Sequence, residues 1–161
     1  MKFSLATIAA FASAVTAATL PSAFTLVGDG GKTVLTDGQY FYVGGNTTAT
    51  NEVAIFHATP DTGAVSFTSK HSSTPTAFQS VFIIENTVSN LELTRPHSGS
   101  VPEGGSTVDF GVNDDGYFTH DGKAYFAVDG YGDNPQKTIY WYGAHSSTYR
   151  SLNLSVKEVQ A

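Results

Sequence analysis

The sequence predicts one all-β domain, an antiparallel β-sandwich, with a β-trefoil as the alternative. Three observations predict this class. Short apolar stretches rich in Val, Phe, Tyr and Thr recur along the chain. Clusters of Gly, Asp, Asn, Ser or Pro separate them at the spacing of about 8–12 residues that is typical of sandwiches and barrels. Outside the N-terminal segment, no run places apolar residues at the helical period of about 3.6 residues, and the 16 glycines suit turns better than helices.

The first half of the domain contains strands whose apolar residues alternate or run together. In 23–27, Phe24 and Leu26 alternate with smaller or polar residues, as expected for a strand with one buried face. The stretch 39–43 is aromatic and 77–84 is rich in branched and aromatic residues, and both compositions favour strands. The strands expected here are 23–27, 33–35, 39–43, 52–58, 64–68 and 77–84.

The second half alternates strands with hairpin turns. "NDDG" (113–116) and "DG" (121–122) each separate two apolar stretches. Asp-Gly favours a type I′ turn, because both central residues of that turn need positive φ. We therefore interpret Asp115 and Asp121 as turn residues and not as a catalytic or metal-binding cluster. The strands expected here are 90–94, 106–112, 116–120, 123–128, 137–143 and 151–159.

Residues 1–17 have the pattern of a secretory signal peptide. Lys2 precedes the uncharged run 3–15, and Val15 and Ala17 supply the small residues of a cleavage site. The run is too short for a membrane-spanning helix, which needs about 20 apolar residues. We therefore expect a secreted chain whose residues 18–161 form the single domain, with no membrane anchor.

The charge and the missing cysteines exclude several classes of function. The chain has 8 Lys and Arg against 14 Asp and Glu, so we expect neither nucleic acid nor an anionic membrane as a partner. The absence of cysteine removes thiol nucleophiles and Cys-based metal sites, and no cofactor is expected. Two glycosylation sequons, at Asn46 and Asn153, agree with secretion. The alternation of 151–156 places Asn153 on the exposed face of a strand.

Motifs for catalysis and metal binding are weak. The chain has no G-x-S-x-G motif and no histidine in a recognisable triad context. The loop 129–135 lacks the pattern of a calcium loop, so no metal is expected, although Asp129 and Asp133 are where a calcium ion would bind. A secreted glycan hydrolase stays an alternative because it needs only two carboxylates across a cleft. No catalytic residue is assigned, since no paired motif selects among Glu52, Glu85, Glu92 and Glu103.

Carbohydrate binding has a stronger signal in the segment 129–150. It contains aromatic residues close to Asp and Asn side chains. Aromatic faces pack on the C–H surface of a sugar ring, and the polar side chains bond its hydroxyls. In 139–142, alternate residues must face opposite sides of the sheet, so either the two tyrosines or Ile139 and Trp141 are core. The predicted ligand-binding residues are Asp129, Tyr131, Asp133, Asn134, Trp141 and Tyr149.

Three stretches resemble a known family. They are "SAFTLVGDGGKTVLTDGQYFYVGG" (22–45), "GAVSFTSKHSSTPTAF" (63–78) and "GYFTHDGKAYFAVDG" (116–130). They resemble the small secreted fungal cell-wall proteins of the PhiA type, which overlap with fungal IgE-binding antigens. The chain departs from that family by lacking cysteine. The resemblance implies a secreted or wall-associated, non-enzymatic protein with a role in conidiation or surface architecture. The further alternative is a secreted effector or antigen that binds a host protein.

Overall fold

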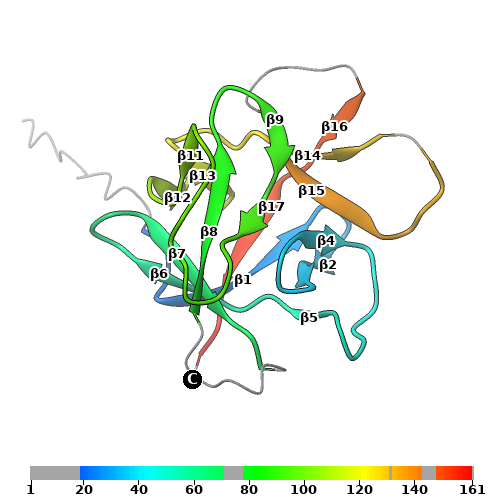
Figure 1. Cartoon of the computed structure of the whole chain (residues 1–161). Helices are drawn as coiled ribbons and strands as arrows, with labels where there is room; N and C mark the ends of the chain where they lie inside the picture. Colours follow the sequence, from blue (N-terminus) through cyan, green and yellow to red (C-terminus); the bar gives the residue numbers. More distant parts are fainter. Residues whose placement is uncertain (1–18, 71–77, 131, 143–147, 161) are drawn as a thin grey trace, which may run out of the picture.

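The structure, a computed structural model, confirms an all-β protein. It describes residues 19–70, 78–130, 132–142 and 148–160, so the predicted signal peptide lies outside the described residues. Every regular element in the described residues is a β-strand, and the named strand pairs are antiparallel. The sheets pack against each other as a β-sandwich (Figure 1). They do not close into a barrel, so the β-trefoil alternative, which is built on a closed barrel, is wrong.

The first sheet follows one path with two short additions. Along the path lie β10 (Glu92–Leu93), β8 (Phe78–Ile84), β7 (Ala64–Thr68), β6 (Phe56–Thr59), β1 (Ala23–Gly28) and β17 (Leu154–Glu158). β11 (Gly105–Ser106) pairs with β8, and β2 (Lys32–Thr33) pairs with β1.

The second sheet contains four of the five aromatic residues of the segment 129–150. Its path is β16 (Tyr149–Ser151), β14 (Phe126–Asp129), β15 (Lys137–Tyr142), β4 (Phe41–Val43), β3 (Leu35–Thr36) and β5 (Glu52–Val53). β9 (Val88–Asn90) also pairs with β15. A separate two-stranded ribbon, β12 (Phe110–Val112) with β13 (Phe118–His120), packs its aromatic side chains into the shared core.

Five of the predicted strands are wrong as single elements, because the chain changes sheet within them. The stretch 106–112 leaves the first sheet after β11 and enters the ribbon at β12. The stretch 33–35 leaves the first sheet after β2 and enters the second at β3. Val34 lies at this corner, where its N–H donates to Leu26 O and its carbonyl accepts from Ala54 N. The stretches 52–58, 90–94 and 151–159 divide in the same way between the two sheets. Strands that switch sheets form the corners of a sandwich.

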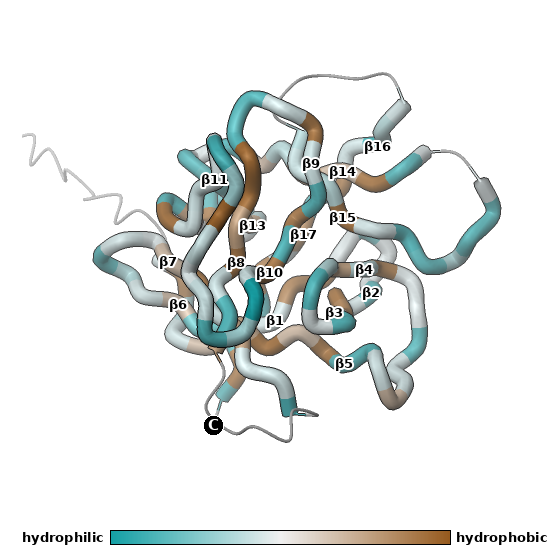
Figure 2. The backbone as a smooth tube through the Cα atoms, in the orientation of Figure 1, coloured by the Kyte–Doolittle hydropathy of each residue, from teal (hydrophilic) through white to brown (hydrophobic). Residues whose placement is uncertain are grey.

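The core between the sheets is aromatic. Phe24, Phe41 and Phe56 are fully buried, and Phe56 lies 5.3 Å, centroid to centroid, from each of the other two rings. Hydrophobic residues concentrate in the strands and hydrophilic ones in the loops (Figure 2). The described part of the chain contains no helix of the length and hydrophobicity needed to span a membrane.

Both predicted turns are present, but each differs from the prediction in one respect. The turn at 113–116 joins the paired strands β12 and β13, but only Gly116 has a positive φ there, so it is not type I′. The turn at 121–122 is type I′, but it leads from β13 to β14, which lie in different sheets and are not paired with each other. Asp121 and Gly122 have φ of 50° and 74°, the two positive values that a type I′ turn needs. The flanking His120 and Lys123 exchange backbone hydrogen bonds of 2.9 and 3.0 Å. In the other turn, Asn113 Oδ1 accepts from backbone N–H groups and closes the loop between β12 and β13.

Candidate functional site

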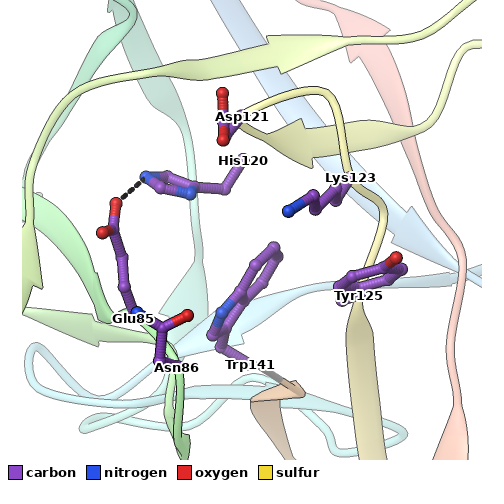
Figure 3. A pocket seen from close by; sticks show the side chains of 7 residues that line it. All are labelled: Glu85, Asn86, His120, Asp121, Lys123, Tyr125 and Trp141. Atoms are coloured by element: carbon purple, nitrogen blue, oxygen red, sulfur yellow. Dashed lines mark ion pairs between the residues drawn. The ribbon is translucent and has the colours of Figure 1, made fainter. Parts of the chain in front are cut away.

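A small pocket opens beside Trp141, where two turns approach the edge of the second sheet (Figure 3). Its volume is about 100 Å³. The turn after β8, the end of β13 with the Asp-Gly turn that follows it, the segment before β14 and the strand β15 supply its walls. The residues that line it, called the Trp141 pocket below, are Glu85, Asn86, His120, Asp121, Lys123, Tyr125 and Trp141.

Local backbone geometry sets both turns. Asn86 has φ of 59°, in the left-handed region that Asn adopts more readily than most residues. The N–H of Glu85 donates to Gly104 O at 3.0 Å, which ties this turn to the loop before β11. The type I′ turn at Asp121 places His120 and Lys123 directly opposite each other. The pocket walls are therefore held by backbone hydrogen bonds.

His120 is the most enclosed residue of the pocket, at 2% exposure. Its Nε2 lies 3.0 Å from Ser106 Oγ and 3.8 Å from Glu85 Oε1. Its ring packs edge-on against Trp141, with centroids 5.5 Å apart. Desolvation lowers the pKa of His120, and the nearby carboxylates of Glu85 and Asp109 only partly oppose this. The imidazole is therefore neutral at neutral pH.

The accessible aromatic surface of the pocket belongs to Tyr125. Tyr125 is 40% exposed, whereas Trp141 is 4% exposed and shows only part of its surface. The two rings lie 5.9 Å apart, centroid to centroid, at an interplanar angle of 38°. Trp141 is itself fixed by edge contacts with Phe126 and His120. The buried indole thus supports an exposed phenol ring.

Polar groups of both kinds surround these rings. Glu85 and Lys123 extend from different walls of the pocket (Figure 3). A carboxylate only accepts hydrogen bonds, an ammonium only donates them, and the amide of Asn86 does both. The pocket therefore presents donors and acceptors around a rigid aromatic base, an arrangement suited to a ligand with several hydroxyls on an apolar ring.

The pair of Ser106 and His120 has the distance of a nucleophile and its base, but His120 is buried and Ser106 is half-buried. Ser106 is not among the residues that line the pocket, and its hydroxyl also donates to Val108 O at 3.2 Å. A catalytic pair must present the nucleophile to a substrate. We interpret this contact as the one that satisfies a buried imidazole.

The glutamates considered for glycan hydrolysis are dispersed. Glu52 is 8% exposed, and its carboxylate accepts hydrogen bonds from the Ser69 hydroxyl and the Lys70 N–H. Glu92 lies on a different part of the surface, where burial raises the pKa of its carboxyl and a hydrogen bond from Tyr40 opposes this shift. Glu103 is exposed in a loop. Of these four residues, Glu85 alone lines the Trp141 pocket.

The structure distributes the predicted ligand-binding residues over several places. Trp141 lines the pocket, and Ile139 and Trp141 are the buried pair of β15. Asp129 and Tyr149 are paired across β14 and β16, where the Tyr149 ring lies 4.9 Å from the Tyr140 ring. The remaining predicted residues are Asp133, exposed in the β14–β15 loop, Asn134, which lines a separate groove, and Tyr131, which lies outside the described residues.

The sequence analysis missed six of the seven residues of the Trp141 pocket as ligand-binding candidates. Tyr125 carried the clearest signal, since it is an aromatic residue in the hairpin that contains Asp121. The predicted turn also placed His120 next to Lys123. Nothing in the sequence indicates that Glu85 and Asn86, more than thirty residues before His120, lie at the same pocket.

The two sequon asparagines differ in their surroundings. Asn46 is exposed in the loop after β4. Asn153 is half-buried between β16 and β17, and its N–H donates to Asp29 Oδ2 at 3.1 Å. Its neighbours Leu152 and Leu154 are buried, as the predicted alternation requires.

Three comparisons with known proteins indicate no function for this chain. The chain has no significant match among protein-family models, curated proteins or solved structures.

Proposed function

We propose that the protein is a secreted, non-enzymatic, cell-wall-associated protein that binds polysaccharide, and that the Trp141 pocket holds one sugar residue of the polymer. The observation that carries this proposal is the exposed ring of Tyr125, which is supported by buried Trp141 and flanked by hydrogen-bonding groups. The fungal wall as the location follows from the resemblance of 22–45, 63–78 and 116–130 to PhiA-type proteins.

The chemistry of the lining fits a neutral sugar. A sugar ring has an apolar C–H face and a rim of hydroxyls that both donate and accept hydrogen bonds. Tyr125 offers the face, and Glu85, Asn86 and Lys123 offer acceptors and donors. Because Glu85 and Lys123 carry opposite charges, this part of the lining does not select for a charged ligand.

The size of the pocket supports the binding of one residue of a chain. Pockets for drug-sized ligands have volumes of roughly 300–1,000 Å³. The Trp141 pocket, at about 100 Å³, is smaller. The other residues of a polymer therefore lie outside it, against the surface.

Binding without turnover agrees with the state of His120. Its Nε2 faces Ser106 and Glu85, and the residue is 2% exposed. A general base must reach the proton that it removes, directly or through one water. His120 lines the pocket, but its Nε2 is already engaged by Ser106 and Glu85, which does not suit a general base for a ligand there.

The experiment uses the single tryptophan of the chain as the reporter. Soluble β-glucan and chitin oligosaccharides are titrated into the protein while tryptophan emission is recorded. We expect the tryptophan emission to change and then saturate as at least one of these oligosaccharides is added. Tyr125→Ala should weaken that binding about 2- to 12-fold, from an aromatic contribution of about 0.5–1.5 kcal/mol.

The matched control is Phe78→Ala, because Phe78 is another exposed aromatic residue, at 65% exposure, outside the pocket. Equal affinities of the Tyr125→Ala variant and the wild type would contradict the placement of the site. Release of reducing sugar that Glu85→Gln abolishes would favour the hydrolase alternative. If the protein neither binds the oligosaccharides nor releases sugar from them, the result favours the alternative of a secreted effector or antigen that binds a host protein.

A further inference from the structure

We propose that a second, separate site binds acidic polysaccharide through its carboxylate groups. The site is a groove of about 580 Å³ on the second sheet, within the roughly 300–1,000 Å³ range of ligand sites. Three cationic side chains line it, Lys32, Lys137 and Arg150, with one carboxylate, Asp29. We call it the basic groove.

The concentration of positive charge in the basic groove is unusual for this chain. The whole sequence has 8 Lys and Arg and a net charge of −6. Three of those cations line one groove. The one acid there, Asp29, already accepts a hydrogen bond from the Asn153 N–H at 3.1 Å. The groove is therefore locally cationic on an acidic protein.

Separate elements hold the cations around the groove. Lys32 comes from β2, and its Nζ lies 3.6 Å from the position where a Cβ at Gly44 would be. Arg150 comes from β16, an edge strand of the second sheet, where it pairs with Val128 of β14. Lys137 begins β15, and its Nζ donates to Gly132 O at 2.9 Å. Lys32 and Arg150 carry the proposal.

The floor of the groove is apolar and preformed. Val43, Val128 and Leu152 line it, and each is at most 8% exposed. Asn134, one of the residues predicted to bind ligand, lies at its side, where its Oδ1 accepts from the Gln136 N–H. An apolar floor below cationic side chains fits the C–H faces of sugar rings that carry carboxylates.

The charge distribution favours a uronate polymer over other polyanions. Guanidinium groups pair with carboxylates and phosphates through two parallel hydrogen bonds. Duplex DNA has one charge per roughly 1.7 Å of its axis and would bring many phosphates close to an acidic surface. A uronate chain has about one charge per ring, so it can match a few cations without that repulsion.

The test measures binding of an oligogalacturonate by calorimetry, with the carboxyl-reduced oligomer of the same length as the neutral ligand. We expect the basic groove to bind the acidic oligomer alone, and to bind it more weakly as salt is raised. The double variant Lys32→Gln, Arg150→Gln should lose about tenfold or more in affinity. The control Arg95→Gln, Lys157→Gln removes the same charge from exposed positions outside the groove and should stay within about twofold.

Thermal melts of both double variants establish that they are folded. The proposal is overturned if the wild type does not bind the acidic oligomer at low salt, if both double variants lose affinity equally, or if the neutral oligomer binds as tightly as the acidic one to the Tyr125→Ala variant, in which the Trp141 pocket is weakened. Tighter binding to duplex DNA or to phosphatidylserine vesicles than to the oligomer would also overturn it. Tyr125→Ala should leave this binding unchanged, which separates the basic groove from the Trp141 pocket.

Discussion

Phe118 joins the β12–β13 ribbon to the sandwich, and its truncation should be among the most destabilising single changes. The residue is fully buried in β13. Its ring centroid lies within 5.3–6.4 Å of four other phenylalanine rings, which are Phe24, Phe56, Phe110 and Phe126. These neighbours belong to β1, β6, β12 and β14, so one side chain contacts both sheets and the ribbon.

The expected cost of Phe118→Ala follows from this environment. A buried Phe→Ala change costs about 3–5 kcal/mol, and the upper part of that range applies where the neighbours cannot collapse into the cavity. Here the four surrounding rings belong to different elements that backbone hydrogen bonds hold apart. We therefore expect about 4–5 kcal/mol, a large part of the roughly 5–15 kcal/mol by which domains are stable.

Urea unfolding followed by circular dichroism measures this free energy, and the melting temperature should fall by roughly 10–20 °C. Phe78→Ala is the matched control, since its ring is 65% exposed, and its cost should stay within about 0.5 kcal/mol. A loss below about 2 kcal/mol for Phe118→Ala would refute the reasoning, because it would mean that the ribbon does not pack into the core.

Three further predictions concern titration and backbone geometry. Because desolvation lowers the pKa of His120 below its ordinary 6.5, the unfolded chain binds the proton more readily, and stability is lost as pH falls below 6.5. Relative to His120→Gln, the wild type should lose up to about 1.4 kcal/mol per pH unit as pH falls below 6.5, measured by urea unfolding at a series of pH values, and parallel curves would contradict this. Gly44→Ala should lower the free energy of unfolding by about 2–5 kcal/mol, because φ is +85° and the new Cβ would lie 2.0 Å from the backbone oxygen of Pro135. Gly122→Ala is the control: φ is +74° but the space around it is open, so the loss in the same assay should be about 1–2 kcal/mol. Burial and the hydrogen bond to Asp37 raise the pKa of Tyr42 to about 12, so Asp37→Asn should move one tyrosine toward 10.0 in an ultraviolet pH titration, and an unchanged titration curve would show that the bond does not form.

Local sequence patterns predict the strands and turns of this protein well. The alternation in 23–27 places Phe24 and Leu26 in the core, and both are fully buried. The Asp121-Gly122 pair forms the turn that its φ preference requires. These predictions succeed because each depends on the geometry of a few neighbouring residues.

The changes of sheet could not be predicted in the same way. At Val34 the chain leaves one sheet for the other inside an apolar stretch with no Gly or Pro to mark the corner. The corner is held by hydrogen bonds to Leu26 and Ala54, which are distant in sequence. The number of strands therefore depends on long-range pairing that a local pattern does not contain.

Only one residue of the candidate site, Trp141, was predicted from the sequence to bind ligand. Trp141 belongs to the Trp141 pocket, but alternation alone did not decide between Trp141 and the tyrosines of β15 as core residues. Glu85 and Asn86 reach the pocket because β8 ends beside the turn that follows β13. That approach arises from sheet packing, and neither residue belongs to a motif.

The measurement that tests the central claim most directly is a pull-down of the protein, without residues 1–17, on insoluble β-glucan, chitin and whole fungal wall, with the supernatant assayed for released sugar. We expect retention on at least one of the three materials, without sugar release, and reduced retention of the Tyr125→Ala variant compared with Phe78→Ala. No retention on any of the three would contradict polysaccharide binding, and release of sugar would contradict a non-enzymatic function.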